Sequence, residues 1–250
     1  MADALLRVDN VSIRFGGLLA VNGASFTAKA GRITALIGPN GAGKTTLFSI
    51  ISGFLRPTDG RIVYDGVDVT GEPPHRLARQ AIARTFQIVQ PFAQLTVREN
   101  IAVGAHLSRS ARADALAAAA DVARAVGLGE RLDQPASALT VAGRKRLELA
   151  RALAIEPRLL LLDEVLAGLN PSEVRDMVPV IRAISERGVT IVMIEHVMQA
   201  VMSLAEQVFV LSEGRVIAEG SPQAIVDDPR VVEAYLGHGA ASRMAEAAHG

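Results

Sequence analysis

A short glycine-rich segment carries the clearest chemistry in this chain. Residues 38–45 read G-P-N-G-A-G-K-T, which fits the phosphate-binding pattern G-x-x-x-x-G-K-[S/T]. Glycines let consecutive N–H groups converge on phosphate oxygens. Lys44 supplies a point charge for the outer phosphates, and Thr45 offers a hydroxyl to a Mg²⁺ ion. The residues predicted to bind the nucleotide here are Gly38, Pro39, Asn40, Gly41, Ala42, Gly43, Lys44, Thr45 and Thr46.

The flanks of this segment predict the elements that must position it. Residues 32–37 form a short apolar run of strand character, and residues 46–51 have a helical apolar pattern that Gly53 can end. Strand, glycine-rich loop and helix in this order are what the motif requires. The helix turns its positive end toward the bound anion. We therefore predict nucleotide binding.

Two acidic residues follow a second strand. Residues 159–162 are four consecutive leucines, followed directly by Asp163 and Glu164. Such runs are typical of a parallel sheet covered on both faces, and ligands bind at the carboxyl edge of these sheets. There Asp163 can hold the Mg²⁺ that Thr45 also touches, and Glu164 can orient or deprotonate a water molecule. A helix N-cap with a first-turn acid is the structural alternative, which we consider weaker in this context.

His196 follows another predicted buried strand, residues 189–194. It therefore reaches the same ligand edge of the sheet, where an imidazole can hydrogen-bond a γ-phosphate and sense its presence.

The rest of the chain divides by composition into two kinds of segment. Residues 5–70 predict a β-rich lobe around the glycine-rich loop. A helix is predicted over residues 110–127, and its alanine run at 117–120 indicates a sparsely packed surface helix. After about residue 150 the alternation of strands and helices resumes, with a helix over residues 172–187 and a hairpin around Glu213 and Gly214.

Composition excludes several other classes of function. The chain has 250 residues, half of them hydrophobic, which suits one large domain or two small ones. Its 26 basic residues balance 26 acidic ones, so no overall basic field favours nucleic acid. The absence of cysteine removes disulfides, thiolate zinc sites and cysteine nucleophiles. Residues 1–7 lack the features of a signal peptide, and no run of about 18 apolar residues exists, so we expect a soluble protein.

The order and spacing of these residues resemble the ATP-binding cassette (ABC) transporter ATPases over nearly the whole chain. The resemblance implies an α/β P-loop NTPase with an antiparallel β-subdomain, a mainly parallel core sheet and an inserted helical subdomain at about 88–150. It implies an ATPase domain over residues 1–237, a flexible tail at 238–250, and ATP with Mg²⁺ as ligands.

Individual residues match the family's motifs. Phe15 matches the aromatic residue that stacks on adenine. Gln87 matches the Q-loop glutamine, which reaches the metal and the water, and Asp163 with Glu164 matches the Walker B pair. His196 matches the switch histidine. The resemblance thus implies a catalytic role for Glu164, His196 and Gln87, and metal contacts for Thr45, Gln87 and Asp163.

The family's signature loop is altered in this chain. Residues 139–146 read L-T-V-A-G-R-K-R where the family usually has L-S-G-G-Q. Thr140 keeps a hydroxyl at the serine position, Ala142 replaces the second glycine, and Gly143 stands at the Gln or Glu position. In the family this loop binds the γ-phosphate of ATP held by the opposite subunit. Ala142 adds a methyl group there, yet we hypothesise that the loop still works because its helix N-terminus and Thr140 remain.

Several segments resemble the LivG-type subunits of branched-chain amino acid importers. They are residues 83–87, 95–101, 167–171 and 231–237, and Asn170 replaces the usual Asp of the D-loop. The resemblance implies three kinds of partner: a second ABC ATPase subunit, integral membrane permeases that dock near Gln87, and indirectly a solute-binding protein. No nucleic acid partner is expected. The implied location is cytoplasmic, on the inner face of the cell membrane.

Alternatives remain open at this point. Importers of urea and other amides look similar at this level. The altered signature loop is compatible with an ATP-binding module that regulates or hydrolyses weakly. A soluble ABC ATPase for repair or translation would need insertions or a second cassette. A P-loop kinase is disfavoured by Gln87, residues 139–153 and His196 in this order.

Overall fold

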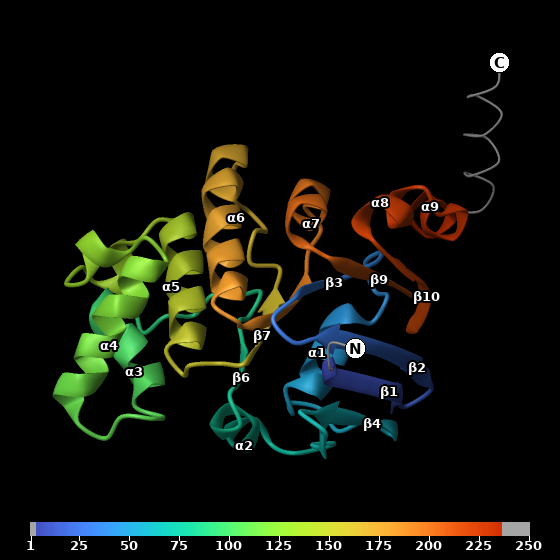
Figure 1. The fold of residues 1–250 in the computed structure, drawn as a ribbon, viewed down its shortest axis with the longest axis horizontal. Helices are drawn as coiled ribbons and strands as arrows, with labels where there is room; N and C mark the ends of the chain where they lie inside the picture. The colour runs from blue at the N-terminus through green and yellow to red at the C-terminus, as the bar shows by residue number, and fades with distance from the viewer. Residues whose placement is uncertain (1–3, 237–250) are drawn as a thin grey trace.

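The computed structural model describes residues 4–236, and its centre is a six-stranded sheet (Figure 1). The strand order is β10-β9-β3-β8-β7-β6, and all neighbours run parallel except β10. This sheet confirms the predicted α/β class with a mainly parallel core. The strands span β3 Ile33–Ile37, β6 Ile82–Arg84, β7 Leu159–Asp163, β8 Thr190–Ile194, β9 Gln207–Ser212 and β10 Arg215–Gly220.

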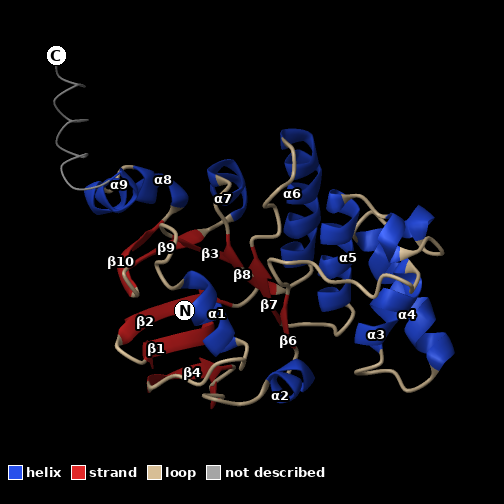
Figure 2. Cartoon of the chain, turned by 180° about the vertical axis from the view of Figure 1, so that it is seen from behind, coloured by secondary structure: helices blue, strands red, loops and turns tan. Residues whose placement is uncertain are grey.

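A second sheet, antiparallel throughout, has the order β2-β1-β4-β5. Its long strands β1 and β2 form a hairpin, and β1 also pairs with β4. Helix α1, which directly follows the glycine-rich loop, lies between this sheet and the core sheet (Figures 1 and 2). The elements span β1 Ala4–Phe15, β2 Leu18–Lys29, β4 Asp59–Tyr64, β5 Val67–Asp68 and α1 Lys44–Ile51.

Alternate residues of the core strands face two different hydrophobic cores. Every residue of β3, β7 and β8 is buried. On β7, Leu160 and Leu162 pack against the cluster that includes α5, α6 and α7 residues, whereas Leu159 and Leu161 pack toward α1 and the antiparallel sheet. Cover on both faces explains why these strands read as uninterrupted apolar runs.

Helices α6 and α7 cover the face of the core sheet opposite α1 (Figures 1 and 2). Asn170 caps α6: its side-chain oxygen accepts from the Ser172 and Glu173 N–H groups at 2.9 and 3.0 Å, and Glu173 accepts from the Asn170 N–H at 2.9 Å. This reciprocal capping fixes where the chain turns after the acidic pair. The remaining helices here span α2 Pro74–Arg79, α6 Pro171–Glu186, α7 Met198–Leu204, α8 Pro222–Val226 and α9 Pro229–Leu236.

Three further helices form a cluster beside the free edge of β6 (Figure 1). They are α3 Val97–Ala105, α4 Arg112–Ala125 and α5 Val141–Leu153, with short 3₁₀ turns at Gly129–Arg131 and Ala136–Ala138. Thr96 and Glu99 form a capping box at the start of α3. The Asn100 side chain, fully buried, donates to three carbonyl groups of residues 92, 95 and 96 and so holds the preceding loop.

The prediction of a sparsely packed surface helix at the alanine run is wrong for one face of α4. Ala115, Ala119 and Ala123, spaced four residues apart, are fully buried against the neighbouring helices, while Ala117 is exposed. Alanine has no side chain beyond Cβ, so these positions let α4 pack closely. The predicted tail at residues 238–250 lies outside the described residues. Within residues 4–236, every helix falls short of the length and apolar character that crossing a bilayer demands.

Helix α3 meets α5 at Gly104, and this contact yields a prediction. A methyl group on Gly104 would lie 2.6 Å from the Arg151 carbonyl oxygen and 3.1 Å from the Ala154 Cβ. We expect Gly104→Ala to lower the unfolding free energy by about 1–3 kcal/mol, although alanine favours helix formation. Denaturant unfolding followed by circular dichroism measures this. Val103→Ala, at a side chain that is 47% exposed, is the control and should change stability far less. Equal stability of Gly104→Ala and the wild type would contradict the tight contact.

Candidate nucleotide-binding site

The glycine-rich loop (the P-loop, residues 38–45) needs glycine at two positions for steric reasons. At Gly38, a Cβ would lie 1.9 Å from the Leu211 carbonyl oxygen of β9. At Gly43, which has φ of 100°, a Cβ would lie 2.4 Å from the Ala20 carbonyl oxygen of β2. No side chain fits either place, so these glycines let the loop pass directly over both sheets.

Lys44 begins helix α1 and is buried beneath this loop. Its Nζ donates to the carbonyl oxygens of Gly38 at 2.8 Å and Pro39 at 2.9 Å. Burial lowers the pKa of Lys44, while the nearby carboxylates of Glu164 and Asp163 act in the opposite direction. An ammonium group has three donors, so one N–H remains for a ligand above the loop.

A cavity of about 660 Å³ opens above the P-loop. Most of the residues predicted for nucleotide binding meet there although they are distant in sequence. Phe15, at the end of β1, is 47% exposed and offers an apolar ring at one side of the cavity. The predicted residues that line it are Phe15, Asn40, Gly41, Ala42, Gly43, Lys44, Thr45, Thr46, Gln87 and Glu164.

Glu164 is held by two side chains from neighbouring segments. Gln87 donates from Nε2 to Glu164 Oε2 at 2.7 Å, and His196 Nε2 lies 2.8 Å from Glu164 Oε1. Glu164 has a left-handed backbone with φ of 50°, which is strained for a residue other than glycine. Its N–H donates to the Ile194 carbonyl oxygen of β8 at 2.9 Å, which fixes this turn. Two of the residues predicted to be catalytic, Gln87 and His196, therefore both contact the third, Glu164.

Asp163 lies beside Glu164 but points to different partners. Its Oδ2 accepts from Arg84 Nη2 at 2.7 Å, and its N–H donates to the Thr85 hydroxyl at 3.1 Å. Burial raises the pKa of Asp163, and the Arg84 guanidinium opposes that rise. Its Oδ1 is buried and has no hydrogen-bond partner.

The three predicted metal contacts line a second, adjoining cavity of about 510 Å³. Thr45, Gln87 and Asp163 all belong to its wall, and Thr45 and Gln87 also line the cavity above the P-loop. Mg²⁺ in nucleotide sites takes one or two carboxylates and completes its shell with phosphate oxygens and water. The orphaned Asp163 Oδ1 with a hydroxyl and an amide nearby fits that donor set.

Lys145 also contributes to this site, although the sequence motifs did not predict it. Lys145 comes from α5, is buried, and its Nζ donates to the carbonyl oxygens of Gln87 at 3.2 Å and Glu164 at 3.1 Å. Burial lowers the pKa of Lys145, and the carboxylates of Glu195 and Glu164 are the strongest opposing influences. The sequence signal that could have identified Lys145 was a lysine on an otherwise apolar face of a predicted helix.

Glu195 was also missed as a contributor. It is 1% exposed, its Oε1 accepts from the Leu166 N–H at 2.9 Å, and its Oε2 has no partner. Burial raises the pKa of Glu195 to about 7, with the hydrogen bonds from Leu166 and His196 acting against that rise. A carboxyl residue that ends a buried strand, as Asp163 does, was the signal that could have found it.

The altered signature loop lies apart from these residues. Thr140 is exposed and caps α5, its hydroxyl accepting from the Gly143 N–H at 3.2 Å. Ala142 is half-buried and Gly143 is buried. A Cβ added at Gly143 would lie 3.2 Å from the Leu139 Cβ. Within residues 4–236, none of these loop residues appears in the wall of the P-loop cavity. The signature loop is thus ordered by its cap but does not line the P-loop cavity of its own chain.

A P-loop between β3 and α1, with paired acids at the carboxyl edge of a parallel sheet, defines a P-loop nucleoside triphosphatase. The narrower class follows from comparison with known proteins. A family model described as "ABC transporter" matches residues 21–167, more than half of the chain. A second, "Branched-chain amino acid ATP-binding cassette transporter", matches residues 215–241. The chain belongs to the ABC transporter ATP-binding family, as its motifs predicted.

Relatives and solved structures agree with this assignment. The chain is 40% identical to the high-affinity branched-chain amino acid transport ATP-binding protein BraF of Pseudomonas aeruginosa and 38% identical to LivG of Escherichia coli, over 95% of this chain and 99% of each relative. A nucleotide-free ATP-binding cassette from an ABC transporter superposes with a TM-score of 0.87, and the ADP conformation of a cassette with 0.86. Both are 30% identical and cover 94% of this chain and 100% of the other.

The raised pKa of Glu195 predicts a pH-dependent stability. The pKa of Glu195 is about 7 in the folded state, against 4.5 for an ordinary glutamate. The stabilisation from the bound proton is therefore complete below pH 4.5 and is lost as the pH rises through 7. Glu195→Gln keeps the acceptor for the Leu166 N–H but cannot ionise. We expect the unfolding free energy of the wild type, relative to this variant, to fall by about 2–3 kcal/mol between about pH 5 and pH 8.

Denaturant unfolding across this pH range measures the difference. Glu186→Gln, at an exposed residue that ends α6, is the matched control and should leave the wild-type profile unchanged. Parallel profiles for Glu195→Gln and the wild type would show that folding does not raise the pKa of Glu195.

Proposed function

We propose that this protein is the ATP-binding and ATP-hydrolysing subunit of an ABC importer for branched-chain amino acids or related amino acids and amides. One observation carries the proposal: a P-loop cavity has Glu164 at its wall, held by Gln87 and His196. The names of the relatives supply the branched-chain substrate class.

In the proposed reaction the residues of this chain bind ATP and place one water molecule. The P-loop N–H groups and Lys44 bind the phosphates, and the Phe15 ring stacks on the adenine. Thr45, Asp163 and Gln87 would hold a Mg²⁺ ion, whose charge would neutralise that of the phosphates. Glu164 orients the water and accepts its proton, and its contacts with Gln87 and His196 fix the direction of the carboxylate.

A second ATPase subunit is part of this proposal. The loop at the start of α5, with Thr140, Ala142 and Gly143, is capped by the exposed Thr140 and does not line its own P-loop cavity. An exposed helix N-terminus suits the γ-phosphate of ATP held by another subunit. The site is therefore complete only in a dimer of ATPase subunits.

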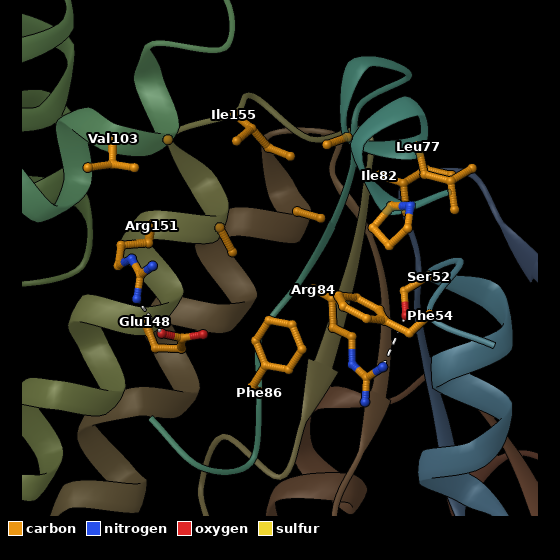
Figure 3. Close-up of a pocket in the computed structure, with 15 residues that line it drawn as sticks. Ser52, Phe54, Leu77, Ile82, Arg84, Phe86, Val103, Glu148, Arg151 and Ile155 are labelled. Atoms are coloured by element: carbon orange, nitrogen blue, oxygen red, sulfur yellow. Dashed lines mark hydrogen bonds and ion pairs between the residues drawn. The ribbon is translucent and has the colours of Figure 1, made fainter. Parts of the chain in front are cut away.

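The permease partner is assigned to a groove between the core sheet and the helical cluster. The groove has a volume of about 250 Å³, and Figure 3 shows Phe54, Phe86 and Val103 on its walls with Arg151 paired to Glu148. Burial raises the pKa of the Glu148 carboxyl. An apolar groove with one partly buried charged pair suits a short amphipathic helix.

The same proposal sets the organisation and the location of the chain. Residues 1–237 act as one ATPase domain in which residues 88–150 are the helical subdomain that carries the signature loop. Binding to permeases would hold the protein on the inner face of the cell membrane. A solute-binding protein would act on it only indirectly, through those permeases.

Glu164→Gln tests the proposed role of the carboxylate. The amide has the shape of the carboxylate and can still contact Gln87 and His196, but it is a poor proton acceptor. Hydrolysis by the assembled complex should therefore fall by about 10²–10⁴-fold. ATP binding should persist, and the variant should form an ATP-dependent dimer that size-exclusion chromatography detects. Exposed Glu186→Gln is the control and should hydrolyse as the wild type does. A monomeric, fully active Glu164→Gln would contradict the assignment.

Ala142→Gly tests the alternative of an ATP-binding module with a weak signature loop. Thr140 already caps this loop, so we expect glycine to raise turnover of the assembled complex by no more than about threefold, less than 1 kcal/mol in the barrier. Phosphate release by the complex measures it, with Val141→Ala at the exposed neighbouring position as the control. A many-fold increase would instead mark the native loop as impaired and favour the weakly hydrolysing module.

A further inference from the structure

Arg84, at the end of β6, is a buried cation whose two terminal nitrogens have partners on opposite sides, while its Nε is buried without a partner. Its side chain is 7% exposed, and that of Asp163, its ion-pair partner, is 1% exposed. Its Nη1 also donates to the hydroxyls of Ser49 at 3.1 Å and Ser52 at 3.0 Å, both from α1 or its end. A planar guanidinium can bridge these groups at once, which a lysine ammonium cannot.

This pairing decides which oxygen of Asp163 is left for a cation. Arg84 occupies Oδ2, and Oδ1 is buried without a partner. The carboxylate is therefore fixed in one orientation, with Oδ1 as its free ligand atom on a residue that lines the metal cavity. Groups that orient a metal ligand in this way strongly affect metal affinity.

Three aromatic rings enclose the guanidinium. The Arg84 Cζ lies 5.9 Å from the ring centroids of Phe48 and Phe54 and 5.3 Å from that of Phe86. Phe54 and Phe86 pack edge to face with their centroids 5.6 Å apart. Cation–π contacts at these distances stabilise the cation, more strongly when water is excluded.

Two of these rings are also the surface of the permease groove. Phe54 is 53% exposed and Phe86 is 42% exposed, and Figure 3 shows both beside Arg84. Arg84 and Phe86 line the metal cavity as well. The same side chains thus separate the groove from the carboxylate that is assigned to the metal.

We propose that Arg84 is a positioning residue for Asp163, and that a helix packed on Phe54 and Phe86 acts on the metal carboxylate through Arg84. Covering the two exposed rings removes water from the outer side of the rings and lowers the local dielectric around the already buried guanidinium, which strengthens both the cation–π contacts and the ion pair. The helix need not touch the nucleotide to have this effect. This inference rests on the proposed function, which supplies both the ATP and the groove's occupant.

The test compares ATP binding by the purified full chain with Mg²⁺ and with EDTA. Arg84→Lys keeps the charge but cannot hold Asp163 and the α1 serines together. We expect the ratio of the Kd for ATP in EDTA to the Kd in Mg²⁺ to fall by about tenfold or more. The Kd in EDTA should stay within about threefold of the wild type, because the P-loop itself is unchanged.

Ser52→Ala separates positioning from a general loss of stability. It removes one hydroxyl partner of Arg84 and leaves the bonds to Ser49 and Asp163, so it should lower the unfolding temperature while changing the Kd ratio by less than about threefold. A ratio that falls in Ser52→Ala as far as in Arg84→Lys, or that stays unchanged in Arg84→Lys, would overturn the positioning role.

The link to the groove has its own pair of variants. Phe54→Leu keeps an apolar side chain but removes one aromatic face from Arg84, so the Kd ratio should fall in the same direction as in Arg84→Lys. Val103→Ala removes a groove side chain from α3 and is expected to leave the ratio as in the wild type. Equal effects of these two variants would overturn the link. Failure of the wild type to bind ATP at all would instead refute the proposed function.

Discussion

The two carboxylates that end β7 impose the main constraint on this site, because a buried carboxylate is costly unless another group pairs with it. Asp163 takes Arg84 from β6, and Glu164 takes Gln87 from the segment after β6 and His196 from the end of β8. These partners flank β7 on both sides. The strand order 8-7-6 therefore brings partners to both acids at the ligand edge, where Asp163 is buried and Glu164 is largely buried.

Carbonyl oxygens of the P-loop itself hold the Lys44 ammonium group in place in the absence of phosphate. The ammonium group donates to two carbonyl oxygens of the loop and lies close enough to Glu164 and Asp163 for their charges to oppose the desolvation of the lysine. Two loop carbonyls and two nearby carboxylates thus preorganise one cation, and a phosphate needs only the remaining donor. Preorganisation of this kind reduces the rearrangement that binding requires.

Residues in a contiguous pattern, or in a family motif as Gln87 and His196 are, were predictable, whereas residues outside such motifs that act through neighbouring elements were not. A contiguous sequence motif predicts the P-loop. An apolar strand that ends in two charged residues predicts the acids of β7. Arg84 and Lys145 matter only because β6 and α5 lie against β7, and no spacing in the sequence specifies that. The prediction for the alanine run of α4 was wrong for the same reason, because the exposure of a small side chain depends on the helix packed over it.

In the proposed dimer, helix α5 connects this chain's own nucleotide site to the signature loop, which would contribute to the site of the second subunit. Thr140 caps its exposed N-terminus, and Lys145, about 7 Å further along the axis, donates to the backbone of Gln87 and Glu164. A helix of thirteen residues with buried contacts along its length moves nearly as one body. In the proposed dimer, a ligand that draws the cap of α5 toward the second subunit would therefore also act on the backbone that carries Glu164. The proposal thus ties the geometry of hydrolysis in one cavity to the occupancy of the other.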